Sequence, residues 1–181
     1  MLPSPPPAPL TAALLAGLLS VAAAAVPGAA PAAATTLPHI QRLERLINAA
    51  GTLTLLSDDC PADHAGFFES GGPAGRGRIV LCANSVDLAD PGAVWHVLAH
   101  EATHVMQNCT GATAIADRWI GRTYRELRLK APQQIWLLSE GYADADRRLE
   151  AEAFWMELQS PELVVEAFRR HCAARLPPDQ R

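Results

Sequence analysis

The chain lacks several features that define other classes of protein. Its 181 residues carry a net charge of −4, without the positive excess that binding to nucleic acid needs. A cationic cluster at residues 118–130 is interrupted by Glu126 and has helical spacing, so we interpret it as the solvated face of a helix. The glycine-rich stretch 71–77 lacks the strand before it and the helix after it that a phosphate-binding loop needs. We therefore expect neither a nucleic-acid partner nor a nucleotide site.

Charge is absent from the beginning of the sequence. The first 38 residues contain no charged side chain, and residues 10–25 form an apolar run followed by small residues spaced as in a signal-peptidase site. The run is shorter than the ~20 residues of a membrane span, and no cysteine follows it to carry a lipid. We expect residues 1–30 to be a cleaved secretory signal peptide, without a membrane span after cleavage. Because no Lys or Arg precedes the run, a disordered tail rich in alanine and proline is the alternative.

Cysteine is scarce, and all four cysteines lie in residues 31–181, a length typical of a single domain. No Cys-x-x-Cys pair occurs, which argues against a cysteine-ligated metal. An even count behind an export signal predicts disulfides and a secreted or periplasmic protein. Three pairings are possible, and we favour Cys60–Cys82, closing a strand-loop-strand unit, with Cys109–Cys172, joining two helices.

The spacing of apolar residues predicts both strands and helices. Short runs of β-branched and apolar residues predict strands at 52–56 and 78–82, with a loop at 61–77 between them. Periodic apolar residues and capping signals predict helices at 40–50, 90–108, 113–129, 133–139, 142–159 and 162–174. We therefore expect an α+β fold, in which a small N-terminal β-sheet packs on a helical bundle.

The most informative motif is His-Glu-x-x-His at residues 100–104. Residues four apart lie on the same face of a helix, so His100 and His104 can direct both imidazoles at one metal ion. Glu101 lies about 100° further round the helix, where it reaches a water molecule on the metal without being a ligand. The flanking residues are uncharged, so the helix is expected to be buried, and a buried His pair is costly without a compensating metal.

The segment 97–106 resembles the zinc-binding helix of the zincin metallopeptidases, with small or apolar residues at the positions where that family has them. The extended metzincin motif is absent, because residues 106–111 contain no histidine. The chain is therefore more similar to the gluzincin branch, over about residues 78–172, and it also resembles small exported metallopeptidase-like proteins. The resemblance implies a minimal zincin-like domain and a third zinc ligand that is a glutamate on a later helix.

Three glutamates are candidates for this third ligand: Glu140, Glu150 and Glu152. Glu150 and Glu152 leave a helix about 200° apart, so only one of them can face the metal, and periodicity does not choose between them. Glu150 is favoured because the sequence Glu-Ala-Glu-Ala at 150–153 resembles the glutamate helix of gluzincins. Glu152 and Glu140 are kept as alternatives.

These residues together predict a zinc-dependent hydrolase. One Zn²⁺ ion is expected on His100, His104 and Glu150, with Glu101 as general base in the cleavage of a peptide or protein substrate. We expect the strand at 78–82 to lie beside the metal helix and to pair with the substrate. Two alternatives are kept: a metal-stabilised exported binding protein without turnover, and a zinc hydrolase of a non-peptide substrate. The sequence does not determine the oligomeric state.

Overall fold

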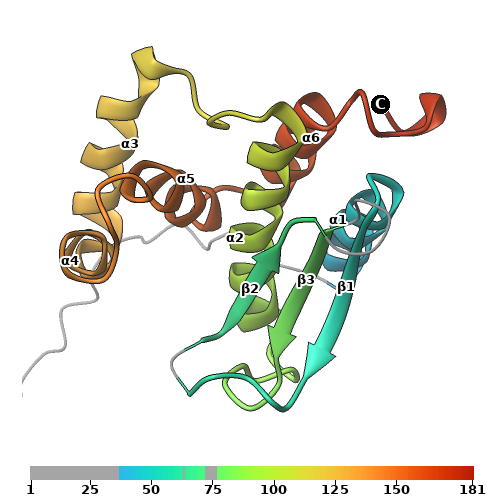
Figure 1. Ribbon diagram of the computed structural model, residues 1–181, viewed down its shortest axis with the longest axis horizontal. Helices are drawn as coiled ribbons and strands as arrows, with labels where there is room; N and C mark the ends of the chain where they lie inside the picture. Colours follow the sequence, from blue (N-terminus) through green and yellow to red (C-terminus); the bar gives the residue numbers. More distant parts are fainter. Residues whose placement is uncertain (1–36, 63, 72–76) are drawn as a thin grey trace, which may run out of the picture. The chain divides into compact units, whose positions relative to one another are not determined.

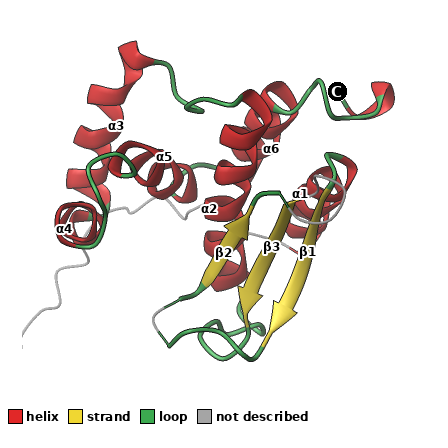
Figure 2. Cartoon of the chain, in the orientation of Figure 1, coloured by secondary structure: helices red, strands yellow, loops and turns green. Residues whose placement is uncertain are grey.

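The structure is a computed structural model that describes residues 37–62, 64–71 and 77–181. The expected signal peptide, residues 1–30, lies outside the described residues, which belong to a compact unit at Pro31–Arg181. In the described part, the fold is α+β, as predicted, with three strands beside a larger set of helices (Figures 1 and 2). The elements in order are α1 (Leu37–Ala49), β1 (Thr52–Ser57), β2 (Gly66–Glu69), β3 (Gly77–Cys82), α2 (Pro91–Thr110), α3 (Asp117–Lys130), α4 (Pro132–Glu140), α5 (Arg147–Glu157), α6 (Pro161–His171) and the 3₁₀ helix η2 (Pro178–Gln180).

The sheet has the order β1-β3-β2, with β1 parallel and β2 antiparallel to the central strand β3. The prediction of a loop at 61–77 is wrong, because this segment contains β2. Four residues are too few to show an alternating pattern, and this strand forms only by pairing with a partner further along the chain. The expectation that the strand at 78–82 offers a free edge is also wrong, since β3 is paired on both sides.

Helix α2 is the centre of the main core. The Asp90 side chain accepts a hydrogen bond from the Gly92 N–H at its start, and Gly111 ends it with a positive φ of 66°. Leu98, Ala102 and Val105 are buried, as the uncharged flanks of the motif predict. The sheet and α1 lie on one side of α2, whereas α5 lies on the other (Figure 1). The helix is thus held on both sides, which fixes the direction of its polar residues.

A second, smaller core joins α3, α4 and α5. Leu127, Leu138, Ala151 and Phe154 are buried together in it. Trp155 adds a polar link between α5 and α3, because its Nε1–H donates to Glu126 Oε2 at 2.8 Å. This second core holds α5, which approaches α2 with its polar face.

Both predicted disulfides are confirmed. Cys60 is bonded to Cys82 and Cys109 to Cys172, and no described cysteine is free. Two disulfides indicate a protein that matures in an oxidising environment, either outside the cell or in the periplasm. None of the helices in the described ranges is both long and apolar enough to cross a membrane.

Candidate metal centre

The two histidines of the motif meet a glutamate from α5. His100 and His104 lie one turn apart on α2, and their Nε2 atoms are 3.3 Å from each other. The Glu150 carboxylate lies between them, with Oε2 3.3 Å from His100 Nε2 and Oε1 3.5 Å from His104 Nε2. One ligand atom from each residue lies within 4.8 Å of the other two. Two imidazoles and a carboxylate at this separation suit a single transition-metal ion such as zinc.

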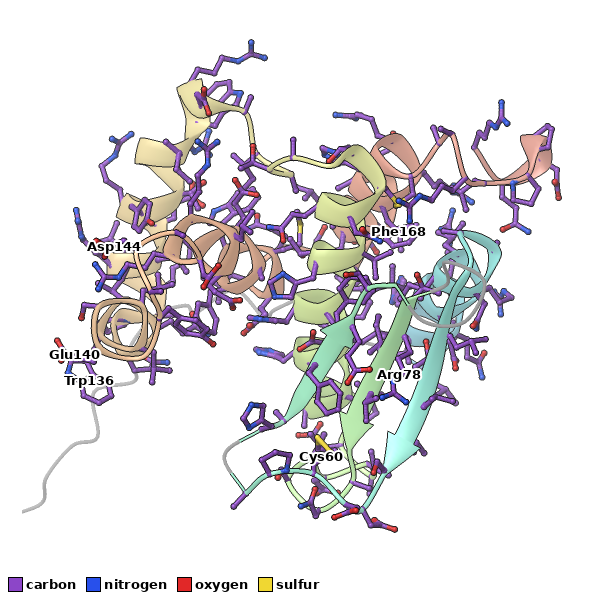
Figure 3. All side chains as sticks on the ribbon, viewed as in Figure 1. Cys60, Arg78, Trp136, Glu140, Asp144 and Phe168 are labelled. Carbon is purple, nitrogen blue, oxygen red and sulfur yellow. A yellow bond between two sulfur atoms is a disulfide. The ribbon has the colours of Figure 1, made fainter. Side chains whose placement is uncertain are left out.

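The other two candidate glutamates lie elsewhere. Glu152 is fully buried and accepts hydrogen bonds from the Ala114 N–H at 2.7 Å, Gln107 Nε2 at 3.2 Å and Arg148 Nε at 3.3 Å. Its carboxylate therefore connects α5 to the segment after α2. Because three protein donors already surround its oxygens, it is not placed to bind a metal. Glu140 is exposed at the end of α4, and its side chain points away from α2 (Figure 3). Of the three predicted alternatives, the structure brings only Glu150 to the histidines.

Two further residues, which the sequence analysis missed, contact the opposite nitrogens of the histidine rings. His100 Nδ1 lies 2.6 Å from Glu157 Oε1, and His104 Nδ1 lies 2.8 Å from Gln107 Oε1. A carboxylate accepts only, so His100 donates its Nδ1–H to Glu157, and Nε2 is the ring nitrogen that faces Glu150. Spacing offered a signal for both contacts: Glu157 is two helical turns after Glu150, and Gln107 is one turn after His104.

The orientation of the Gln107 amide determines the tautomer of His104. The Gln107 Nε2 group donates to the Leu149 carbonyl at 3.0 Å and to Glu152. Its Oε1 atom is therefore the acceptor that faces His104, whose Nδ1 must carry the proton. The Nε2 atoms of both imidazoles therefore point at the same place, and they are the nitrogens that would give up a proton to bind a metal.

Glu101 faces the same cleft as the candidate ligands without joining them. The cleft has a volume of about 330 Å³ and is lined by His64, Gly66, Phe67, Phe68, His100, Glu101, His104, Tyr142 and Glu150. Glu101 is only 5% exposed. Burial raises the pKa of Glu101, and the neighbouring histidines oppose this rise. A carboxylate with a raised pKa is a better proton acceptor than an ordinary surface glutamate.

The electrostatics of the centre favour a bound cation. Burial lowers the pKa of His100, but hydrogen bonds to Glu150 and Glu157 outweigh burial and raise it to about 10. Burial likewise raises the pKa of Glu150, and the two histidines outweigh it and lower this pKa to about 2. Burial and the charge of Glu150 raise the pKa of Tyr142 to about 12. The raised pKa values of His100 and Tyr142 report the negative charge of the carboxylates around the imidazole pair, whereas the lowered pKa of Glu150 reports the positive charge of the two histidines. The carboxylates around the pair therefore favour a cation.

Comparison with known proteins finds that part of the chain matches a family, and that family has no assigned activity. Residues 84–173 match a family described as a domain of unknown function (DUF8637). No curated protein and no solved structure matches the chain. The matched segment contains both α2 and α5, so the three candidate ligands and Glu101 all lie within it.

Proposed function

We propose that this protein is an exported zinc-dependent hydrolase that cleaves peptide bonds. The observation that carries the proposal is the meeting of His100, His104 and Glu150 within 4.8 Å, with Glu101 in the same cleft. A histidine pair on one helix with a glutamate from a later helix is the arrangement that the resemblance to gluzincins implies. The two disulfides support export, and the signal peptide at residues 1–30 belongs to this proposal.

The three ligands fit the chemistry of a catalytic zinc site. His100, His104 and Glu150 would hold the zinc ion, which would act as a Lewis acid toward water and a substrate carbonyl. Glu101 takes the proton of the attacking water and then passes it to the leaving amine. Glu157 and Gln107 hold the two rings in the ligand tautomer, so that the imidazoles need no reorientation when the metal binds.

The sheet edge beside the cleft suits an extended peptide. β2 is an edge strand, and its Gly66, Phe67 and Phe68 line the cleft together with Glu101. The backbone groups on the outer side of β2 pair with no other described strand, so they are available for a substrate strand. β2 therefore replaces the strand at 78–82 as the expected peptide-binding edge.

A structural zinc site is the main alternative to a catalytic one. Structural zinc has four protein ligands, whereas catalytic zinc has three and keeps one position open. Among the described residues, only His100, His104 and Glu150 form a group able to bind a metal. This count of three supports catalysis over the binding protein without turnover.

The test combines metal analysis with an activity assay on single variants. His100→Ala and His104→Ala should lose stoichiometric zinc, because two remaining ligands bind it far less tightly. Glu101→Gln should keep zinc and lose activity against unfolded protein substrates such as casein by roughly 10²–10⁴, the usual contribution of a general base. Glu140→Gln, which changes an exposed glutamate in the same way, is the matched control and should match the wild type. Loss of zinc from Glu101→Gln, or wild-type turnover by this variant, would refute the assigned role.

A further inference from the structure

A second cavity lies away from the metal centre, among α3, α5, α6 and the segment 113–116. Its volume is about 640 Å³, within the range of ~300–1,000 Å³ typical of sites for small organic ligands. The apolar side chains of Ile115, Trp155, Met156 and Leu163 contribute to its walls. The cavity is large enough for a ligand with an apolar body, and it does not involve any residue of the candidate metal centre.

Large apolar side chains at this cavity are in contact with solvent. Trp119 is 49% exposed and Leu163 is 42% exposed, and both line the cavity. Each Å² of apolar surface that a ligand removes from water stabilises the complex by about 25 cal/mol. A ligand that lies between these two side chains would therefore gain binding energy that the free protein does not use.

The charged residues of the cavity are all cationic, although the whole chain has a net charge of −4. They are Arg118, Arg122 and Arg170, and no Asp or Glu lines the cavity. Arg122 is neutralised by Glu126 at 2.8 Å, and Arg170 pairs with a glutamate one turn before it at 3.5 Å. Burial and the charge of Arg170 lower the pKa of His171, which also lines the cavity, so this ring adds no positive charge near pH 7.

Arg118 is the cation that is left for a ligand. No described carboxylate lies within ion-pair distance of it, in contrast to Arg122 and Arg170. Its guanidinium carbon lies 5.8 Å from the centroid of the Trp119 ring, which holds the charge next to apolar surface. A guanidinium in this position can bind both oxygens of a carboxylate at once.

We propose that this cavity binds a long-chain aliphatic carboxylate, with the hydrocarbon chain against Trp119, Trp155 and Leu163 and the carboxylate on Arg118. The apolar walls select the chain, and the unpaired guanidinium selects a negative end group. A protein partner fits less well, because the volume matches a small molecule better than an extended interface. The inference does not depend on the metal centre or on its activity.

The test is a binding titration of the purified chain with dodecanoate below its micellar concentration. Binding is followed by calorimetry and by tryptophan fluorescence, since two of the lining residues are tryptophans. We expect one saturable site, with affinity at least tenfold weaker for dodecanol and for dodecyltrimethylammonium, which carry the same chain without the carboxylate. Equal affinity for all three amphiphiles, or no saturable binding of dodecanoate, would overturn the proposal.

Two matched arginine variants locate the site. Arg118→Gln should weaken dodecanoate binding about 10- to 100-fold, the effect of removing a charge-assisted hydrogen bond. Arg128→Gln removes the same charge from an exposed position on α3 that does not line the cavity, and should change affinity less than about twofold. Equal losses in both variants would show charge attraction only and would contradict the assignment. Leu163→Glu, checked for folding by circular dichroism, places an anion at the cavity and should also abolish binding; retained binding in this variant counts against the proposal.

Discussion

Glu150 and Glu152 stand two positions apart on α5, and their side chains have opposite surroundings. Glu150 faces two imidazoles and the cleft, whereas Glu152 accepts three hydrogen bonds in the interior. Each carboxylate is compensated by a different kind of partner, so the same substitution at the two positions should affect different properties. A carboxylate at a metal site contributes to metal affinity, and a buried, fully hydrogen-bonded carboxylate contributes to stability.

We predict that Glu150→Gln loses most bound zinc but unfolds at nearly the wild-type denaturant concentration when both proteins are metal-free. Glu152→Gln should instead keep most zinc and lower the free energy of unfolding by about 2 kcal/mol, because its amide cannot accept all three hydrogen bonds. Zinc content after dialysis and urea unfolding of the metal-free proteins measure the two effects. The reverse result, with zinc retained in Glu150→Gln and lost from Glu152→Gln, would move the third ligand.

The sequence was informative about residues close together in the chain and less so about distant ones. The relation of His100 to His104 follows from helical spacing alone. The choice of Glu150 over Glu152 depends on how α5 is rotated against α2, which is determined by the packing of Phe154 and its neighbours. A helix with acidic residues on both flanks of its apolar stripe does not reveal this rotation in its own sequence.

At the scale of elements, β2 lies so close to α2 and to β3 at Gly66 that only glycine fits there. A Cβ atom on Gly66 would lie 2.5 Å from Val97 Cγ1 and 2.9 Å from the Val80 carbonyl oxygen. Both contacts are shorter than van der Waals distance, and the second is to backbone that cannot rotate away. β2 can therefore take its position at the cleft only because residue 66 is a glycine, which has no Cβ atom.

Gly66→Ala should lower the free energy of unfolding by about 1–3 kcal/mol, the usual cost of overpacking, and should also reduce any peptidase activity. Gly121→Ala is the control on exposed α3, where the nearest atom to a new Cβ is Arg125 Nη1 at 3.7 Å. That variant should be stabilised by about 0.5–1 kcal/mol through higher helix propensity. Urea unfolding compares the two, and a Gly66→Ala protein as stable as the wild type would contradict the close approach.

Most helices were predictable as elements, because their apolar periodicity and caps are local. Asp90 and Pro91 mark the start of α2 in the sequence and in the structure. β2 was missed for the opposite reason. Its four residues become a strand through hydrogen bonds to β3, and the order β1-β3-β2 is a property of pairing between segments and not of any one of them.

At the scale of the whole molecule, the two disulfides close loops of different length. Cys60–Cys82 spans 22 residues and Cys109–Cys172 spans 63. A disulfide stabilises the folded state mainly by restricting the unfolded chain, and the effect grows with the length of the loop. Removing the Cys109–Cys172 bond by Cys109→Ala with Cys172→Ala should lower the free energy of unfolding by about 4 kcal/mol. Removing the Cys60–Cys82 bond by Cys60→Ala with Cys82→Ala should lower it by about 3 kcal/mol. Denaturant unfolding of the two double variants measures both costs. Titration of about four thiols in the denatured, unreduced protein would refute the disulfides themselves.

The same two bonds determine how the protein responds to proteases. A cut anywhere between Cys60 and Cys82, or between Cys109 and Cys172, leaves the two fragments joined by sulfur. The stretch between the two loops is 83–108, and most of it is the buried helix α2, which proteases reach only after unfolding. A molecule cut in β2, or in α3 or α4, would therefore stay in one piece until it is reduced. If the protein is the exported peptidase proposed above, the two disulfides would keep α2 and α5 together when it is exposed to its own activity.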